Sequence, residues 1–350
     1  MGVAVAPDTA KPPTENAFLK ACSACARCAH RRPLREKQRV PFPRSLRIIV
    51  HMRIGITGAT GLIGSAFGKL AATHGHELVA FTRAPQRTTL PWASEVRPID
   101  TRAKLPLDAW GLDVLVHLAG ESIMGLWTAA KKKRIRDSRV DLTQRIVRCL
   151  AEPSPRPAAL ISASGVGIYG SRSNEVLTES SQHGADFLAD ICVEWEAAAQ
   201  RAEQLGLRVV TLRTGLVLAK EGGLLPLMRT AFSFALGGRL GSGAQWMPWI
   251  HLQDEVRLIL WAVENRQVSG PLNLSAPHPV TNAEFTTQLA RAVHRPAIFH
   301  APAFLLKQLP GGFGNMILGS QRAVPDKALA GGFQFDHPDL APALQNVLAQ

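Results

Sequence analysis

The chain has 350 residues, of which 46% are hydrophobic and 19% charged, a composition that is ordinary for a globular protein with a large core. The formal net charge is +13, but ten Lys/Arg against three Asp/Glu give residues 1–51 a charge of +7, which leaves +6 for the other 299 residues and argues against a specific nucleic-acid partner. No apolar run reaches the roughly 18 residues that a bilayer-spanning helix requires, so we expect no membrane partner and a cytoplasmic location.

The first 51 residues are rich in Pro, Arg and Ala and show no clear helical or strand period. Because Met52 stands immediately before the first expected strand, we interpret residues 1–51 as a disordered extension or as the result of a misassigned start codon. A transit peptide has little support, since only Ser23 and Ser45 supply serine.

A C-x-x-C-x-x-C cluster lies inside this leader, formed by Cys22, Cys25 and Cys28 with a histidine two residues on. Thiolate and imidazole ligands suit zinc or an iron–sulfur cluster. No second ligand cluster follows and no strands or helices frame the first, so we expect chance cysteines and no metal site. The other two cysteines, Cys149 and Cys192, fall in apolar helical patterns, which predicts reduced thiols in the core.

From Met52 onward, short apolar runs alternate with helical patterns of ten or more residues. This alternation predicts a parallel sheet covered by helices on both faces, and right-handed crossovers make it doubly wound. We therefore expect an α/β protein with a doubly wound, Rossmann-type sheet. The expected strands span residues 53–57, 76–82, 96–100, 113–120, 158–165 and 208–219, and the longest helices span 129–151 and 187–206.

After about residue 220 the pattern loosens into segments rich in Gly, Trp and Pro, which are typical of loops that line a cleft. A short strand is expected at 271–277. The helix that follows is predicted to open with a capping box, Thr281 with Glu284 three residues on. We divide the chain into a main domain at 52–298 and a small C-terminal domain at 299–350, and expect the C-terminal part to form a smaller substrate lobe.

The strongest chemical signal is the glycine-rich stretch between the first strand and its helix, where three glycines form G-x-x-G-x-x-G. The first two permit a tight turn and close approach of the backbone to a pyrophosphate, and the third lets the helix pack against the strand. Free N–H groups at the helix N-terminus attract the phosphates. The alternative is a glycine-rich turn without a ligand. The predicted phosphate-binding residues are Gly58, Ala59, Thr60, Gly61, Leu62, Ile63 and Gly64.

The end of the second strand distinguishes the two nicotinamide cofactors. An NAD site would place an acidic residue there to accept a hydrogen bond from the ribose 2′-hydroxyl. Arg83 stands there instead, and its guanidinium suits a 2′-phosphate, so we predict NADP rather than NAD; a solvated surface arginine is the alternative. His117 lies in an apolar run and is expected to be a core histidine. The other predicted cofactor neighbours are Asp100 near the adenine and Leu118, Ala119, Gly120 and Glu121 on the nicotinamide side.

Several motifs together resemble the extended short-chain dehydrogenase/reductase superfamily, the group of nucleotide-sugar epimerases and dehydratases. They are TGATGLIG, VLVHLAG, SASGVGIYG, LRTGLVLA and WIHLQDEV. The segments KKKRIRDSRVDLT, FLADICVEWEAAA and PDKALAGGFQF are similar to an atypical branch of epimerase-like proteins of unknown substrate. The resemblance covers residues 52–349 and implies an NAD(P)-binding epimerase-like domain followed by a small C-terminal domain of unknown function.

Members of this superfamily typically use a Ser or Thr after the fifth strand, and a Tyr and a Lys four residues apart on the next helix. Ser164 matches the serine position and is the candidate catalytic residue; its alternative is a hydrogen bond to nearby backbone. The only tyrosine, Tyr169, matches a structural turn of the superfamily, so we expect it to be structural or at most to line the cleft. If Glu196 aligns with the superfamily's usual glutamate, Leu188 and Cys192 occupy the dyad positions, and neither can act as a phenol or an ammonium.

Three further residues, two tryptophans and one histidine, are expected to line the substrate cleft together with Tyr169. Trp127 follows the fourth strand, and loop packing is its alternative. Trp246 and His251 lie in a segment that closes over the active site in related proteins, although His251 more often holds that loop in place.

Two arginines complete the set of candidates. Arg139 is expected on a helix near the cleft, with a salt bridge to Asp137 or Asp141 as the alternative. Arg213 is expected to be buried at a strand end and paired.

Two functions from different classes are consistent with these patterns. The first is an NADP-dependent oxidoreductase or epimerase-like enzyme that acts on an unidentified small molecule and lacks the usual Tyr–Lys dyad. The alternative is a non-catalytic NADP-binding sensor or partner-binding protein. No oligomeric state is predicted.

Overall fold

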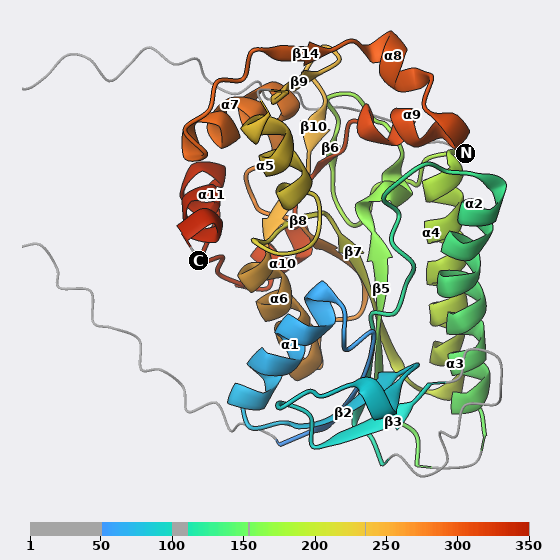
Figure 1. The fold of residues 1–350 in the computed structure, drawn as a ribbon. Helices are drawn as coiled ribbons and strands as arrows, with labels where there is room; N and C mark the ends of the chain where they lie inside the picture. The colour runs from blue at the N-terminus through green and yellow to red at the C-terminus, as the bar shows by residue number, and fades with distance from the viewer. Residues whose placement is uncertain (1–50, 100–110, 153–154, 235, 350) are drawn as a thin grey trace, which may run out of the picture. The chain divides into compact units, whose positions relative to one another are not determined.

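The computed structural model describes residues 51–99, 111–152, 155–234 and 236–349 (Figure 1). The cysteine cluster at Cys22, Cys25 and Cys28 and the expected adenine neighbour Asp100 lie outside the described residues. Within the described ranges, no helix combines the length and the apolar character needed to cross a membrane.

A seven-stranded parallel sheet forms the centre of the fold, with its strands in the order β12-β7-β5-β4-β1-β2-β3 (Figure 1). The strand order reverses between β1 and β4, and in doubly wound folds ligands bind in the crevice at the carboxyl ends of such strands. The prediction of a doubly wound α/β sheet is confirmed. The strands are β1 (Arg53–Thr57), β2 (Glu77–Thr82), β3 (Glu95–Pro98), β4 (Val114–His117), β5 (Ala159–Gly165), β7 (Arg208–Thr214) and β12 (Gly270–Leu274).

Side chains that alternate along each strand divide between two cores. In β5, Ile161 belongs to the core covered by α1 (Leu62–Thr73) and α6 (Leu252–Glu264). The preceding Leu160 belongs to the core covered by α3 (Leu142–Leu150) and α4 (Phe187–Gln200), on the other side of the sheet in Figure 1. Both faces of the sheet are therefore buried, which explains why its strands are apolar throughout.

The single strand expected at 208–219 is wrong, because the chain changes sheet in its middle. β7 ends at Thr214, and β8 (Leu216–Leu218) pairs in parallel with β11 (Trp249–His251) outside the central sheet. A Cβ atom on Gly215 would lie 2.2 Å from the carbonyl oxygen of Pro248, so only glycine permits this close crossing.

The long helix expected at 129–151 is continuous but not uniform. α2 (Ala129–Arg136) runs into a π-helical turn at Asp137–Asp141, and α3 follows directly. π-Helical turns are rare in proteins, and those that occur lie frequently at functional sites. Here the turn lies beside the carboxyl end of β4, where the candidate site is built.

The C-terminal residues pair with earlier parts of the chain. β14 (Phe299–Ala301) pairs with β9 (Gly238–Leu240), and β15 (Arg322–Ala323) pairs with β6 (Val176–Leu177). The described residues accordingly form one compact unit, and the domain boundary at 298 stays a prediction. The remaining elements are α5 (Leu225–Ser233), β10 (Trp246–Met247), β13 (Val280–Thr281), α7 (Asn282–Ala292), α8 (Ala303–Lys307), α9 (Phe313–Ile317), α10 (Asp326–Ala330) and α11 (Leu340–Ala349), with short 3-10 turns at Pro85–Arg87, Val166–Tyr169, Arg201–Leu205 and Pro310–Gly312.

The capping box predicted at the start of α7 is confirmed. The Thr281 hydroxyl accepts a hydrogen bond from the backbone N–H of Glu284 at 3.3 Å, and the Glu284 carboxylate accepts one from the backbone N–H of Thr281 at 2.8 Å. Two otherwise unpaired donors at the helix end are satisfied in this way.

Candidate functional site

The glycine loop joins β1 to α1 in a conformation that only glycine tolerates. Gly58 has a φ of +73°, and a Cβ atom there would lie 2.7 Å from the backbone of Leu118 on β4's exit loop. A Cβ atom on Gly64 would lie 2.2 Å from the carbonyl oxygen of Gly58, so helix α1 packs directly on the loop. Gly61 is the N-cap of α1; no side chain caps the helix and its first turn carries no acidic residue. The positive end of α1 is therefore open to an anion.

A cavity of about 730 Å³ opens at the carboxyl ends of β1, β2 and β4, and we call it the larger cavity. The glycine loop lines one side of it, and the α2–α3 helix with its π turn lines the opposite side. The volume is within the range of roughly 300–1,000 Å³ found for small-molecule and cofactor sites. Its lining residues are Gly58, Thr60, Gly61, Phe81, Thr82, Arg83, Ile99, Leu118, Ala119, Gly120, Glu121, Lys133, Arg134, Asp137, Ser138, Asp141, Leu142 and Arg145.

The structure thus brings most of the predicted cofactor residues to one cavity. Ala59 is completely buried beneath the loop, and Leu62, Ile63 and Gly64 belong to the first turn of α1 rather than to the cavity lining. The predicted residues that line the cavity are Gly58, Thr60, Gly61, Arg83, Leu118, Ala119, Gly120 and Glu121.

Three cations that the sequence analysis did not assign to the cofactor also line the larger cavity: Lys133, Arg134 and Arg145. They lie on the α2–α3 helix, far along the chain from the glycine loop and Arg83. The run KKKRIR was visible in the sequence, but a basic run on a helix is most often a solvated face. Only the packing of this helix beside β4 shows that Lys133 and Arg134, which belong to this run, line the same cavity as Arg83.

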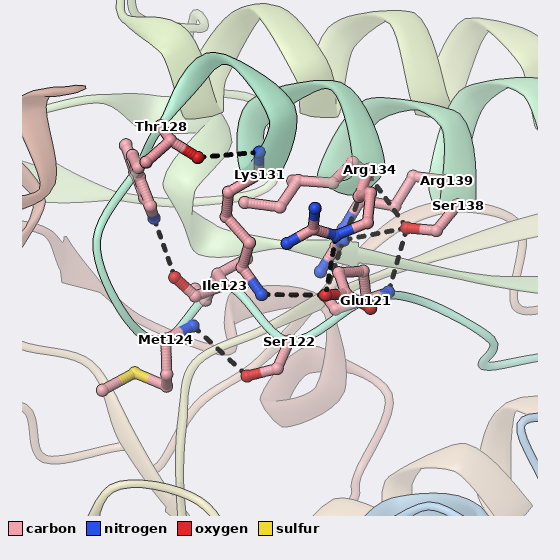
Figure 2. A network of polar contacts seen from close by, with 11 residues as sticks. Glu121, Ser122, Ile123, Met124, Thr128, Lys131, Arg134, Ser138 and Arg139 are labelled. Carbon is pink, nitrogen blue, oxygen red and sulfur yellow. Dashed lines mark hydrogen bonds and ion pairs between the residues drawn. The ribbon is translucent and has the colours of Figure 1, made fainter.

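Glu121 is the centre of a polar network between the β4 exit loop and this helix (Figure 2). Its carboxylate accepts a hydrogen bond from Lys131 at 2.9 Å and pairs with Arg134 at 3.6 Å. The hydrogen bond from Lys131, together with the positive charges of Lys131 and Arg134, holds the pKa of the Glu121 carboxyl below its ordinary value. The backbone N–H of Glu121 donates to the Ser138 hydroxyl at 2.9 Å. This network fixes the loop that forms the inner wall of the cavity.

The π turn directs Arg139 inward. Its Nη1 donates to the carbonyl oxygen of Glu121 at 2.9 Å (Figure 2). Its guanidinium lies 5.2 Å from the ring of Trp195. Burial lowers the pKa of Arg139 below its ordinary value. The alternative of a salt bridge to Asp137 or Asp141 is wrong: these carboxylates pair with lysine and arginine side chains of α2, because the extra residue of the turn rotates Arg139 to the buried face.

A buried ion pair lies below the end of β5. Arg213 is 7% exposed and donates from Nε and Nη2 to the two carboxylate oxygens of Glu196, each at 2.9 Å. Burial acts to lower the pKa of the Arg213 guanidinium, but the hydrogen bonds and charge of Glu196 outweigh it and raise that pKa above its ordinary value. Ser164, 6% exposed, donates its hydroxyl proton to Glu196 Oε1 at 2.7 Å. The expectation that Arg213 is buried and paired is confirmed, while Ser164 bonds to a carboxylate rather than to backbone.

Tyr169 belongs to the same buried network. It has no exposed surface; its hydroxyl donates to Asn273 Oδ1 at 2.6 Å and accepts from Arg213 Nη1 at 2.9 Å. Burial raises the pKa of this phenol. This geometry is that of a structural residue. The suggestion that Tyr169 lines a cleft is wrong, because its ring is fully buried and its hydroxyl is bound to Asn273 of β12 and Arg213 of β7.

Helix α4, where the superfamily places its tyrosine and lysine, contains neither residue type. Leu188 lies against Gly167, and Cys192 is a free thiol that is 6% exposed. Burial raises the pKa of the Cys192 thiol to about 12, so it is uncharged at neutral pH. Cys149 is also free and only partly buried.

A second cavity of about 180 Å³, which we call the smaller cavity, lies between the start of α4 and the segment 311–321. Trp127, 4% exposed, forms one of its walls, and its indole N–H donates to the carbonyl oxygen of Ile123 at 2.8 Å. The predicted cleft residue Trp127 is therefore placed at a cavity. Its lining residues are Trp127, Gly167, Ser171, Asp186, Phe187, Leu188, Gly311, Gly312, Asn315, Met316, Gly319 and Gln321.

Trp246 and His251 line neither of these two cavities. The Trp246 indole donates to Asn174 Oδ1 at 2.8 Å. His251 is 2% exposed, and its Nδ1 accepts from the backbone N–H of Gln253 at the start of α6. Burial lowers the pKa of His251 to about 4. The prediction that His251 faces the cleft is wrong, because β11 pairs with β8 and carries its ring into the packing beside His337.

His117 is a core histidine, as predicted. It is completely buried, and its ring nitrogens contact the hydroxyls of Thr57 at 2.6 Å and Thr143 at 2.9 Å. Burial lowers the pKa of His117 to about 4, so the ring is neutral at physiological pH.

Comparison with known proteins places these features in a family. The sequence matches the NAD dependent epimerase/dehydratase family over residues 54–275 and a domain of unknown function, DUF1731, over residues 301–347. It is 40% identical over 295 residues to the epimerase family protein ML0860 of Mycobacterium leprae, covering 83% of this chain and 94% of that protein.

Solved structures share the fold. The human epimerase family protein SDR39U1 (isoform 2), crystallised with NADPH, superposes with a TM-score of 0.76 at 31% identity and covers 85% of this chain and 100% of its own. UDP-glucuronic acid 4-epimerase from Bacillus cereus, in complex with UDP-glucuronic acid and NAD, reaches a TM-score of 0.67 at 16% identity over 85% of this chain and 99% of its own, a likeness of fold alone. With the match over 54–275 and the identity to curated relatives, this chain belongs to the NAD dependent epimerase/dehydratase family.

Proposed function

We propose that this protein binds NADP in the larger cavity and acts on a small-molecule substrate as an oxidoreductase or epimerase-like enzyme without the usual Tyr–Lys dyad. The observation that carries the proposal is that the glycine loop, the open N-terminus of α1 and Arg83 all line one cavity at the strand-order reversal. Human SDR39U1, which is 31% identical and was crystallised with NADPH, supports the choice of cofactor.

The residues present fit a dinucleotide. The backbone of Gly58, Thr60 and Gly61 would hold the diphosphate, because no Cβ atom stands in the way at the glycines and the helix end is positive. Arg83 would hold the 2′-phosphate, and the segment Leu118–Glu121 would line the nicotinamide side. When bound, the nicotinamide supplies or accepts a hydride. Ser164 remains the candidate catalytic residue on the family resemblance; it lines neither of the two cavities, and its hydroxyl proton is directed at Glu196.

Replacing Arg83 by glutamine should weaken NADPH binding by roughly 10- to 100-fold, because a charge-assisted hydrogen bond to the 2′-phosphate contributes about 1.5–3 kcal/mol. NADH, which has no 2′-phosphate, should bind with unchanged affinity. Isothermal titration of both cofactors measures the two effects. Arg87→Gln is the matched control, since Arg87 is exposed on the next turn and does not line the larger cavity. Equal losses for NADPH and NADH would contradict the role of Arg83.

A non-catalytic NADP-binding protein is the second candidate, and one observation favours it. Helix α4 carries no Tyr and no Lys, and the hydroxyl of Ser164 is committed to Glu196. The discriminating experiment follows NADPH absorbance with a panel of aldehydes and ketones. Oxidation of NADPH that depends on the added carbonyl compound supports the enzyme, whereas tight binding without any turnover supports the sensor.

A further inference from the structure

The loop between β4 and α2 contributes a lining residue to each of the two cavities. Glu121, at the start of the β4 exit loop, lines the larger cavity, and Trp127, at its end, lines the smaller one. Leu188, which occupies the tyrosine position if Glu196 aligns with the superfamily's usual glutamate, also lines the smaller cavity and contacts Gly167. We propose that the smaller cavity is the substrate site and that it accepts small, uncharged, partly apolar alcohols or carbonyl compounds rather than nucleotide sugars. This inference rests on the cofactor role proposed above.

The walls of the smaller cavity combine an apolar group of side chains with a few uncharged polar ones and one carboxylate. The ring of Trp127 lies 5.1 Å from that of Phe187, and Leu188 and Met316 complete the apolar lining. Four polar side chains, those of Ser171, Asp186, Asn315 and Gln321, also line the cavity and could orient a ligand oxygen. Such a site favours a compact ligand with an apolar body and one or two polar groups.

The charges at the smaller cavity disfavour a diphosphate. None of its lining residues is a lysine, arginine or histidine, and the single ionisable side chain among them is Asp186. One oxygen of that carboxylate caps α4 by accepting from the backbone N–H groups of Leu188 and Ala189, each at 3.0 Å. The nearby ammonium of Lys132 lies over the ring of Phe187 at 4.6 Å, outside the lining. Phosphate groups are normally recognised by arginine or lysine side chains, which this cavity does not provide.

The volume of the smaller cavity also argues against a nucleotide sugar as ligand. An apolar cavity of about 150 Å³ accommodates benzene, so a cavity of about 180 Å³ suits a ligand with roughly six to ten non-hydrogen atoms. Sites for drug-sized molecules occupy roughly 300–1,000 Å³. A nucleotide sugar, with its base, two sugars and two phosphates, exceeds the smaller cavity several-fold.

The C-terminal segment 311–321 limits the size of the smaller cavity. Gly311, with a φ of +76°, lies so close to the loop that a Cβ atom on it would be 1.8 Å from the carbonyl oxygen of Trp127. Two residues on, the ring of Phe313 packs 5.8 Å from the ring of Trp127 and is 8% exposed. The segment 311–321 therefore forms a wall that is packed against Trp127 in the loop between β4 and α2, which gives the C-terminal region a role in substrate selection.

The test uses the full chain saturated with NADPH and follows saturation transfer by NMR from the protein to three probes: cyclohexanone, benzyl alcohol and UDP-glucose. Transfer is expected to the first two probes and not to UDP-glucose. Asn315→Trp should fill the cavity from its exposed rim and lower the affinity for cyclohexanone at least tenfold. Leu227→Trp is the matched control, because Leu227 is exposed on α5 and lines neither cavity. Met316→Ala, which enlarges the cavity, should strengthen binding of the larger ketone 2-tetralone relative to cyclohexanone.

Three results would overturn the inference: transfer to UDP-glucose that cyclohexanone displaces, equal cyclohexanone binding by Asn315→Trp and Leu227→Trp, or no transfer to either small probe by the wild type. Thermal melting of each variant shows that it is folded. NADPH titration of the same samples, and repetition of the transfer experiment without NADPH, separate the two proposals. If the wild type did not bind NADPH, the proposed function would be wrong. If it bound NADPH but neither small probe, only the inference about the smaller cavity would be wrong.

Discussion

Replacing Arg213 by methionine is expected to lower the free energy of unfolding by roughly 3–5 kcal/mol, as for other buried ion pairs that lose one partner. The substitution leaves the Glu196 carboxylate, which is 5% exposed, without the two hydrogen bonds from Arg213. It also removes the donor to the buried hydroxyl of Tyr169. Methionine fills a similar volume, so the loss reports the uncompensated charge more than a cavity. Urea unfolding followed by circular dichroism measures the effect.

Two further variants show whether charge is the cause. The double variant E196Q/R213M removes both charges and should recover most of the lost free energy, because no unpaired ion remains. Arg136→Met breaks the exposed pair between Arg136 and Glu194, whose side chains are 44% and 45% exposed, and should cost about 0–1 kcal/mol. If R213M cost no more than R136M, the buried pair would not stabilise the fold in the way described.

Replacing Glu255 by glutamine is expected to change how stability depends on pH. Glu255 is completely buried in α6, its Oε1 accepts from the Thr214 hydroxyl at 2.9 Å, and its Oε2 has no hydrogen-bond partner in the part of the chain that the structure describes. Burial raises the pKa of the Glu255 carboxyl to about 8, so the native state holds a proton that the unfolded chain releases near pH 4.5. Stability contributed by this group is complete below pH 4.5 and is lost as the pH rises through 8.

The glutamine variant keeps a neutral side chain of the same shape at every pH. Relative to E255Q, the wild type should lose roughly 3–5 kcal/mol between pH 4.5 and 8, since each unit of pKa shift corresponds to about 1.4 kcal/mol. Urea unfolding at half-unit pH intervals gives the difference between the two proteins. His117 and His251 have pKa values lowered to about 4 and act in the opposite sense, losing stability as the pH falls below about 6.5. Their contribution is common to both proteins and cancels.

Glu203→Gln serves as the control for this pH series, because Glu203 is exposed and its replacement should leave the wild-type curve unchanged. Parallel curves for the wild type and E255Q would show that Glu255 is ionised in the native state, and the assignment of a buried neutral carboxyl would be wrong.

The sequence alone determined the framework of this protein. The period of its apolar runs predicted the strands of the central sheet, and the spacing of Gly58, Gly61 and Gly64 predicted the loop that lines the larger cavity. Thr281 and Glu284 predicted a helix start. These features are local. Strand period, turn geometry and helix capping depend on residues within a few positions of one another, so they can be predicted from the sequence.

Only the tertiary structure decided what surrounds that framework. Tyr169 bonds to Asn273, 104 positions away, and Trp127 packs on Gly311, which lies in the C-terminal region. The π turn rotates Arg139 away from the carboxylates beside it in the sequence. Contacts of this kind depend on how whole elements pack in space, and no local periodicity encodes which distant side chain will meet which. Thus the glycine loop could be predicted from the residue order, whereas the buried ion pair's exact partners and the two cavities required the folded chain.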